Sequence, residues 1–160
     1  TGLSMTYCVE TPMNEASASS YQWLAANLTM PVLGPENMEG KFHTRAEWIR
    51  NGACDILRTG AYDVGGIGPA LKTIHLAEAF GMECEVHQAG PGNLTLCAVQ
   101  ANGKWYERGL LHPMLDYDTP PQYLNSLVDP MDEDGFVHLS QLPGLGYDIN
   151  FDYINNSLCE

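Results

Sequence analysis

Four ionisable residues and one glycine follow short apolar runs at nearly regular intervals along the chain. They are Glu10, Glu36, Gly60, His87 and Glu107, and successive members stand 26, 24, 27 and 20 positions apart. Three of them carry carboxylates and one carries an imidazole. Carboxylates bind hard divalent cations, and a histidine transfers protons near neutral pH. The types and spacing of these residues therefore predict metal-assisted acid–base chemistry in a fold that brings them together.

A repeated strand–helix unit would bring these residues together. Parallel strands joined by helices end at the same edge of a sheet, and the spacing is that of such a unit. Expected strands cover residues 7–10, 31–36, 53–58, 82–86 and 105–107. Expected helices cover residues 14–27, 44–51 and 69–80, with a helix or loop at 90–101. We predict a five-stranded parallel arc with helices on its outer face, as in part of a (β/α)8 barrel, where the strand ends form the active-site face.

Glu10 and Glu36 form the first candidate pair. Each lies within two residues of a proline, in Glu10-Thr11-Pro12 and in Gly34-Pro35-Glu36, so the chain leaves the strand there. Neighbouring strands lie about 4.8 Å apart, and two carboxylates that close repel each other unless they share a proton or a cation. A single glutamate at a strand end is usually only solvated. Two in phase on consecutive strands indicate a shared Mg²⁺ ion, which prefers oxygen ligands.

His87 and Glu107 are the other candidates. An imidazole at a strand end can act as a general acid or base, although a lone histidine is more often structural. Glu107 would hydrogen-bond a substrate oxygen if protonated and would orient a neighbour if ionised, while Arg108 beside it could equally make a structural ion pair. The Gly65-Gly66 pair lacks the spacing of a dinucleotide fingerprint and a P-loop lysine, so it predicts a tight turn.

Composition excludes several classes of partner. The 160 residues include 20 acidic and 7 basic side chains, for a net charge of −13. Such a surface repels nucleic acid and anionic membranes, and we expect neither as a partner. The five cysteines are scattered and form no C-x-x-C motif, which favours a reducing, cytoplasmic location. No signal peptide or apolar run of transmembrane length is visible, and the start at Thr1 suggests a cut into a longer protein.

The pattern changes near residue 112. Prolines break the rest of the chain into loops and short pieces, with a strand-like run at 136–139 and an amphipathic run at 150–158. We therefore expect two parts, a partial barrel over residues 1–112 and a C-terminal return segment over residues 113–160.

Several motifs, taken in order, resemble the enolase superfamily, in particular its mandelate racemase-like group with many acid-sugar dehydratases. The motifs are Val9-Glu10-Thr11-Pro12, Gly34-Pro35-Glu36-Asn37, Cys54 to Leu57 with Gly65-Gly66-Ile67, Val86-His87, Tyr106-Glu107 and Pro143-Gly144-Leu145-Gly146. The resemblance covers almost the whole chain. It implies the fourth to eighth strands of the barrel, followed by a segment that returns toward the capping domain.

The resemblance also implies a reaction. In that family Mg²⁺ holds the substrate carboxylate, a base removes the proton α to it, and the metal stabilises the enediolate intermediate. The implied activity is dehydration of a sugar acid, an aldonate or aldarate. By position, Glu10 and Glu36 are implied to be metal ligands, His87 the acid or base, and Glu107 an electrophilic or substrate-contacting residue. We expect the complete protein to be a homo-oligomer.

Two departures from the family pattern matter. The aspartate that usually backs the histidine is replaced by Gly60 (or Thr59), and Asp63 lies further on. We therefore expect His87 to lack its orienting partner, which favours a dehydratase acid over a racemase base.

The second departure is that the capping domain, the first three strands, the third metal ligand and the base on the second strand have no counterpart. A full barrel takes roughly 250 residues. The rest would come from a longer chain or a second polypeptide. A racemase or epimerase, and a non-catalytic half-barrel that serves in binding or assembly, remain as alternatives.

Overall fold

The computed structural model describes residues 7–38, 40–109, 112 and 114–158 of the chain. Four parallel strands form one sheet in sequence order: β1 (Val9–Glu10), β2 (Val32–Gly34), β3 (Ile56–Thr59) and β4 (Glu83–Val86). Leu33 pairs with Ile56, and Thr59 pairs with Val86. The predicted parallel arrangement in sequence order is confirmed, with strands shorter than the apolar runs.

Helices follow each strand. They are α1 (Ala18–Asn27), α2 (Lys41–Asn51), α3 (Ala61–Val64), α4 (Ile67–Ala79) and α5 (Pro91–Val99), with α6 (Phe151–Asn156) near the end of the chain. Gly52 ends α2 in the left-handed conformation (φ 61°), as its position predicts. Pro91 lies in the first turn of α5, where its missing N–H has no intrahelical partner to lose. The sequence did not predict α3.

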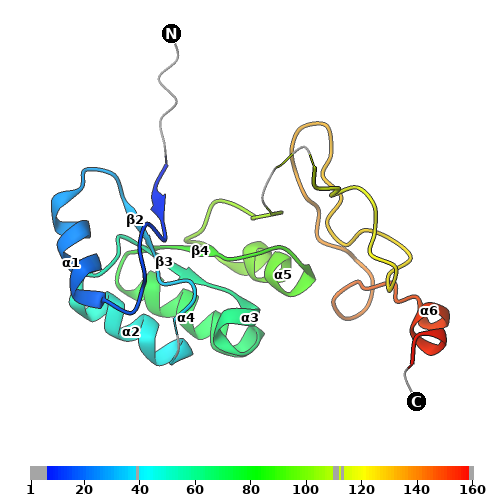
Figure 1. Ribbon diagram of the computed structural model, residues 1–160, viewed down its shortest axis with the longest axis horizontal. Coiled ribbons are helices and arrows are strands. Elements are labelled where there is room, and N and C mark those ends of the chain that lie inside the picture. Colours follow the sequence, from blue (N-terminus) through cyan, green and yellow to red (C-terminus); the bar gives the residue numbers. More distant parts are fainter. Residues whose placement is uncertain (1–6, 39, 110–111, 113, 159–160) are drawn as a thin grey trace, which may run out of the picture.

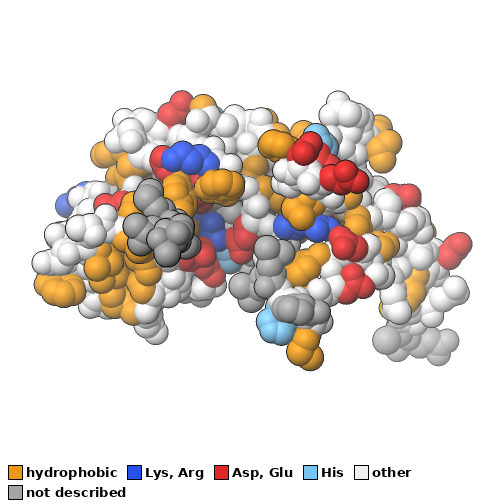
Figure 2. All heavy atoms as spheres, turned by 90° about the horizontal axis from the view of Figure 1, so that it is seen from above, with side chains coloured by type: hydrophobic (Ala, Val, Ile, Leu, Met, Phe, Trp, Pro, Cys, Tyr) orange, Lys and Arg blue, Asp and Glu red, His pale blue; other side chains and the backbone are white. Residues whose placement is uncertain are grey.

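The hydrophobic core lies between the sheet and the helices. α1, α2 and α4 lie along one side of the sheet (Figure 1). Successive strand residues face opposite sides, so Leu57 enters the core while Arg58 lies on the other face. Trp48 of α2 packs so close to β2 that a Cβ on Gly34 would lie 3.0 Å from its ring. Seen from above, acidic, basic and hydrophobic side chains lie next to one another on the surface (Figure 2).

The fifth strand predicted at residues 105–107 is wrong in extent, because this run forms less than a strand. Residues 105–107 contribute a single parallel bridge, between Val86 and Tyr106. Glu85 explains why: its two carboxylate oxygens accept hydrogen bonds from Lys104 N (3.0 Å) and Trp105 N (3.2 Å). Those N–H groups therefore bond to a side chain instead of a strand ladder. The run still enters parallel to β4, so Glu107 reaches the expected edge of the sheet.

Residues 112 and 114–158, here called the C-terminal segment, lie beyond α5 and away from the sheet (Figure 1). In its described part the strand predicted at 136–139 is only an antiparallel bridge between Met131 and Val137. Arg108 joins this segment to the rest: its Nε donates to Asp129 O (3.0 Å) and its Nη2 to Tyr117 O (2.7 Å). None of the helices within the described ranges is long and apolar enough to cross a lipid bilayer.

Candidate functional site

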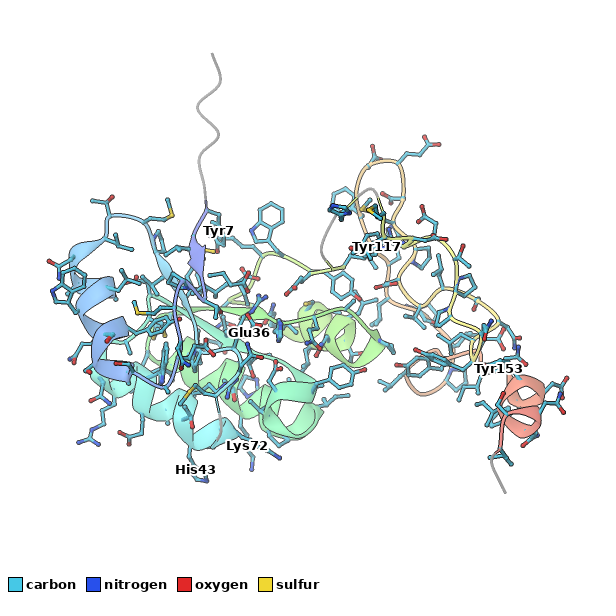
Figure 3. All side chains as sticks on the ribbon, viewed as in Figure 1. Tyr7, Glu36, His43, Lys72, Tyr117 and Tyr153 are labelled. Atoms are coloured by element: carbon cyan, nitrogen blue, oxygen red, sulfur yellow. The ribbon has the colours of Figure 1, made fainter. Side chains whose placement is uncertain are left out.

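The four candidate residues lie at the carboxyl ends of β1, β2, β4 and the short run at 105–107. Glu10 ends β1, Glu36 follows β2, His87 directly follows β4, and Glu107 follows the Val86–Tyr106 bridge. Figure 3 shows Glu36 in the middle of the sheet and its helices, with His43 and Lys72 on the outer side of the helices. The four side chains meet in two groups of polar contacts.

The first group joins Glu36, His87 and Asp63. His87 Nε2 lies 3.1 Å from Glu36 Oε1, and His87 Nδ1 lies 3.1 and 3.2 Å from the two carboxylate oxygens of Asp63. Thr11 donates to Glu36 Oε2 at 3.1 Å, and the Asn37 amide donates to Glu36 Oε1 at 3.0 Å. Both ring nitrogens of His87 are thus held by carboxylates.

The expectation that His87 lacks an orienting carboxylate is wrong. A Cβ on Gly60 would collide with Asp63 Oδ2 and would lie 2.9 Å from the carbonyl oxygen of His87. The glycine therefore leaves open the space at the end of β3, and the Asp63 side chain, carried by α3, fills it. The sequence signal was a glycine at a strand end followed by an aspartate in the first turn of a helix.

The pKa of His87 is raised above its ordinary value. Burial alone would lower it, but the hydrogen bond and charge of Asp63 and the charge of Glu36 outweigh burial and the opposing charge of Arg58. The raised pKa favours the imidazolium form, so at a given pH His87 is protonated, and available as a proton donor, to a greater extent than an unperturbed histidine. Asp63 fixes the ring through Nδ1, which leaves the Nε2 proton on the side of Glu36. This arrangement suits a general acid.

The second group is centred on Arg58, which sequence reasoning missed. Its Nη2 pairs with Glu10 Oε1 at 2.5 Å and also with Glu107 Oε2. The Arg58 side chain is only 6% exposed, and its Nε has no hydrogen-bond partner within the described residues. A charged residue directly after the apolar pair Ile56-Leu57 was the available signal, since such a side chain is buried only when paired.

The two groups are joined through the main chain after β4. Glu107 Oε2 also accepts a hydrogen bond from Gln88 N at 3.0 Å, directly beside His87. Burial raises the pKa of Glu10, with the charge of Arg58 opposing and those of Glu107 and Glu36 adding to the increase. The pKa of Glu10 therefore depends on charges from both groups, as expected for side chains that lie close together at one edge of the sheet.

Glu10 and Glu36 have the donor chemistry that a hard divalent cation requires. Glu10 is partly exposed, and each residue presents carboxylate oxygens to the strand-end face. Within the described residues, no group of three or more His, Cys, Asp or Glu side chains could hold a metal ion. These two carboxylates fit one part of a ligand set, which needs further oxygen ligands from water, substrate or other parts of the protein.

Comparison with known proteins points to one family. The sequence model described as "Enolase C-terminal domain-like" matches residues 3–153. A D-galactonate dehydratase from Ralstonia nicotianae is 29% identical over 155 residues, which cover 89% of this chain and 38% of the relative.

Solved structures agree. A D-glucarate dehydratase from Agrobacterium tumefaciens, complexed with magnesium, superposes with a TM-score of 0.92 and 62% identity, over 95% of this chain and 40% of that one. An L-talarate/galactarate dehydratase from Salmonella typhimurium LT2 gives a TM-score of 0.74 and 25% identity, over 93% and 35%. The chain thus spans less than half the length of each of these relatives.

Proposed function

The chain belongs to the enolase C-terminal domain-like family, and on that premise we propose that it is the C-terminal part of a barrel enzyme that dehydrates a sugar acid with the help of Mg²⁺. The observation that carries the proposal is the contact of His87 with both Asp63 and Glu36 at the strand ends. The similar proteins named above are dehydratases of sugar acids, which supports an aldonate or aldarate as substrate.

Glu10 and Glu36 would hold the metal in this proposal. Both supply carboxylate oxygens, the ligands that Mg²⁺ prefers, and further ligands would come from outside this chain. Bound there, Mg²⁺ would supply Lewis-acid stabilisation of the charge that develops on the substrate carboxylate. Thr11 and Asn37 orient the Glu36 carboxylate by hydrogen bonds to its two oxygens.

His87 would be the general acid. Its raised pKa favours the protonated form, and Asp63 fixes the ring so that the Nε2 proton faces the site. In dehydration that proton goes to the departing β-hydroxyl, which leaves as water. The α-proton would be taken by a base that this chain does not contain.

Glu107 would orient its neighbours. It accepts from Arg58 and from Gln88 N, so it acts in this structure as an acceptor and not as a donor. Of its two predicted roles, these contacts favour orientation of the chain beside His87 over electrophilic contact with substrate.

We also propose that the rest of the barrel and the capping domain complete the enzyme, either in the same polypeptide or in a second one. Residues 1–112 would then be the C-terminal strands of the barrel. Residues 113–160 would return toward the capping domain, which would cover the apolar side chains that are exposed in the described part of this segment.

A racemase or epimerase is the second candidate. The Asp63–His87 contact favours it, because a histidine backed by a carboxylate is also equipped to act as a base. Both reactions begin with removal of the same α-proton, so the product distinguishes them.

The test is a screen of the complete protein against aldonic and aldaric acids with Mg²⁺. We expect formation of a 2-keto acid from at least one acid, and its loss when a chelator removes the metal. Products that are epimers of the substrate, with no 2-keto acid, would favour the racemase. Absence of both products across the library would contradict the enzyme and favour a binding or assembly module.

A further inference from the structure

Two buried charged residues, which have no part in the proposed reaction, contact the backbone of the turn that carries Glu36. Arg45 of α2 has 0% of its surface exposed, and Glu15, in the loop after β1, has 5%. Charge buried in a protein interior is unfavourable unless hydrogen bonds and opposite charges compensate it. Their contacts should therefore show what these two residues do.

Glu15 binds the N–H groups of the turn that carries Glu36. Its Oε1 accepts from Glu36 N at 2.5 Å, and its Oε2 accepts from Asn37 N at 2.6 Å. A carboxylate that accepts two successive backbone N–H groups fixes the orientation of the peptide between them. Glu15 comes from the loop after β1, so it also ties that loop to the one after β2.

Arg45 binds the carbonyl groups of the same turn. Its Nη2 donates to Pro35 O at 3.1 Å and to Glu36 O at 2.8 Å. Its other donors reach further backbone carbonyls: Met38 O (3.2 Å), Lys41 O (3.3 Å) and Arg58 O (3.3 Å). The last contact reaches the strand residue that pairs with Glu10.

We propose that Glu15 and Arg45 are positioning residues that hold Glu36 in the orientation needed to bind the metal. Neither touches the reacting groups. The carboxylate accepts from the Glu36 N–H and the guanidinium donates to the Glu36 C=O, so both polar groups of the Glu36 backbone are held. The inference rests on the proposed function, because it takes Glu36 as a metal ligand.

Conservative variants separate positioning from charge. Arg45→Lys keeps the positive charge, but one ammonium with three N–H groups cannot serve five carbonyls spread around a planar fork. Glu15→Gln keeps the shape, but it turns one acceptor oxygen into an NH₂ donor that faces a backbone N–H. Either change loosens the turn while Glu36 itself remains.

The experiment is a titration of the complete protein with Mn²⁺, followed by electron paramagnetic resonance, which reports bound metal without any need for turnover. We expect Arg45→Lys and Glu15→Gln each to raise the Kd for Mn²⁺ by about 10–100-fold, the usual effect of a residue that orients a ligand. Because both residues hold the same turn, the double variant should raise the Kd by less than the product of the two single fold-changes.

Two controls accompany the variants. Glu47→Gln changes an exposed carboxylate on the same helix, which forms an ion pair with Arg50 and lies outside the Glu36 turn, and it should leave the Kd unchanged. Ile74→Val removes a methylene from a core residue that is 1% exposed, so it lowers the melting temperature without touching the turn.

Metal affinity within twofold of wild type in both folded variants would overturn the proposal, and so would an equal loss in Ile74→Val. If Arg45→Lys does not fold, the Kd of Glu15→Gln alone tests the proposal. Glu15→Gln leaves the buried Arg45 guanidinium and its hydrogen bonds in place. A wild-type protein that binds no Mn²⁺ would overturn the proposed metal site, and this inference with it. Wild-type binding with unaffected variants would overturn the inference only.

Discussion

The strand–helix region, residues 7–38 and 40–109, differs from the C-terminal segment in where its apolar side chains lie. In the strand–helix region Leu57 is 0% exposed and Trp48 2%. In the C-terminal segment Met114 is 86% exposed and Leu158 72%, and Leu124 is the one apolar side chain of its described part that is buried. One region therefore encloses a core, and the other leaves its apolar surface uncovered.

This difference shows which region forms a hydrophobic core from its own side chains and which region leaves apolar side chains for another part of the protein to cover. The strand–helix region positions Glu10, Glu36 and His87 with its own loops and helices. The C-terminal segment is attached in part by polar contacts, such as the hydrogen bond from Tyr106 OH to Asp129 Oδ2 at 2.6 Å. Exposed apolar patches usually mark interaction surfaces, which agrees with our proposal that another part of the protein covers this segment.

The largest expected difference between the regions is in stability. Leu57→Ala should lower the free energy of unfolding of this chain by about 2–5 kcal/mol, because it opens a cavity in the core. Met114→Ala should change it by less than about 0.5 kcal/mol, since that side chain is exposed. Urea denaturation measures both. Equal losses would mean that the C-terminal segment has a core of its own.

A second substitution tests how the two regions are joined. Asp129→Ala leaves the half-buried Tyr106 hydroxyl without its acceptor and should cost about 1–3 kcal/mol. Hydrogen exchange should then increase in the C-terminal segment and stay unchanged in the sheet. Asp118→Asn is the matched control, because its carboxylate is 89% exposed and its pairing with Arg108 contributes little. Faster exchange in the sheet would contradict a junction confined to the segment.

Two glycines of the strand–helix region should respond differently to substitution by alanine, one by disturbing the site and the other by stabilising the chain. Gly60→Ala places a methyl against Asp63 and the His87 carbonyl, so it should move Asp63 away and lower the pKa of His87. Gly68 in α4 has open space around its missing Cβ, and Gly68→Ala should stabilise the chain by about 0.5–1 kcal/mol. Imidazole resonances followed by NMR during a pH titration, together with denaturation, measure both effects. An unchanged His87 pKa in Gly60→Ala would refute the role assigned to the glycine.

The smallest expected effect concerns two histidine–aspartate pairs, one in each region. The folded pKa of His87 is raised, so its stabilising contribution is full below the unfolded value of 6.5 and is lost as pH rises through the folded pKa. Asp63→Asn should reduce this loss. The pKa of Asp132, hydrogen-bonded to His138, is lowered, so that contribution is lost only as pH falls below about 3.8.

Denaturation across about pH 3–9 compares the two pairs. Asp63→Asn should alter the profile on the neutral side and Asp132→Asn only at the acidic end. A change at neutral pH in Asp132→Asn, with none in Asp63→Asn, would reverse the assignment of the buried and exposed pairs.

The sequence predicted the strand–helix order and the meeting of four side chains, because strand ends in a parallel sheet share one edge. It could not predict Asp63 as the partner of His87, since that contact depends on the space left by Gly60 in three dimensions. Arg58 was missed because its pairing depends on residues from distant strands. The fifth strand was overestimated because Glu85, a residue of β4, takes the N–H groups that a ladder would have used.

The role of His87 is the central claim, and one variant tests it most directly. In the complete protein with Mg²⁺ and an active sugar acid in D₂O, His87→Asn should abolish formation of the 2-keto acid but retain exchange of the substrate α-proton for deuterium. That result follows if His87 only protonates the departing hydroxyl and a base outside this chain removes the α-proton. Loss of exchange together with dehydration would contradict the assignment and make His87 necessary for both steps, and full dehydration would remove it from the mechanism.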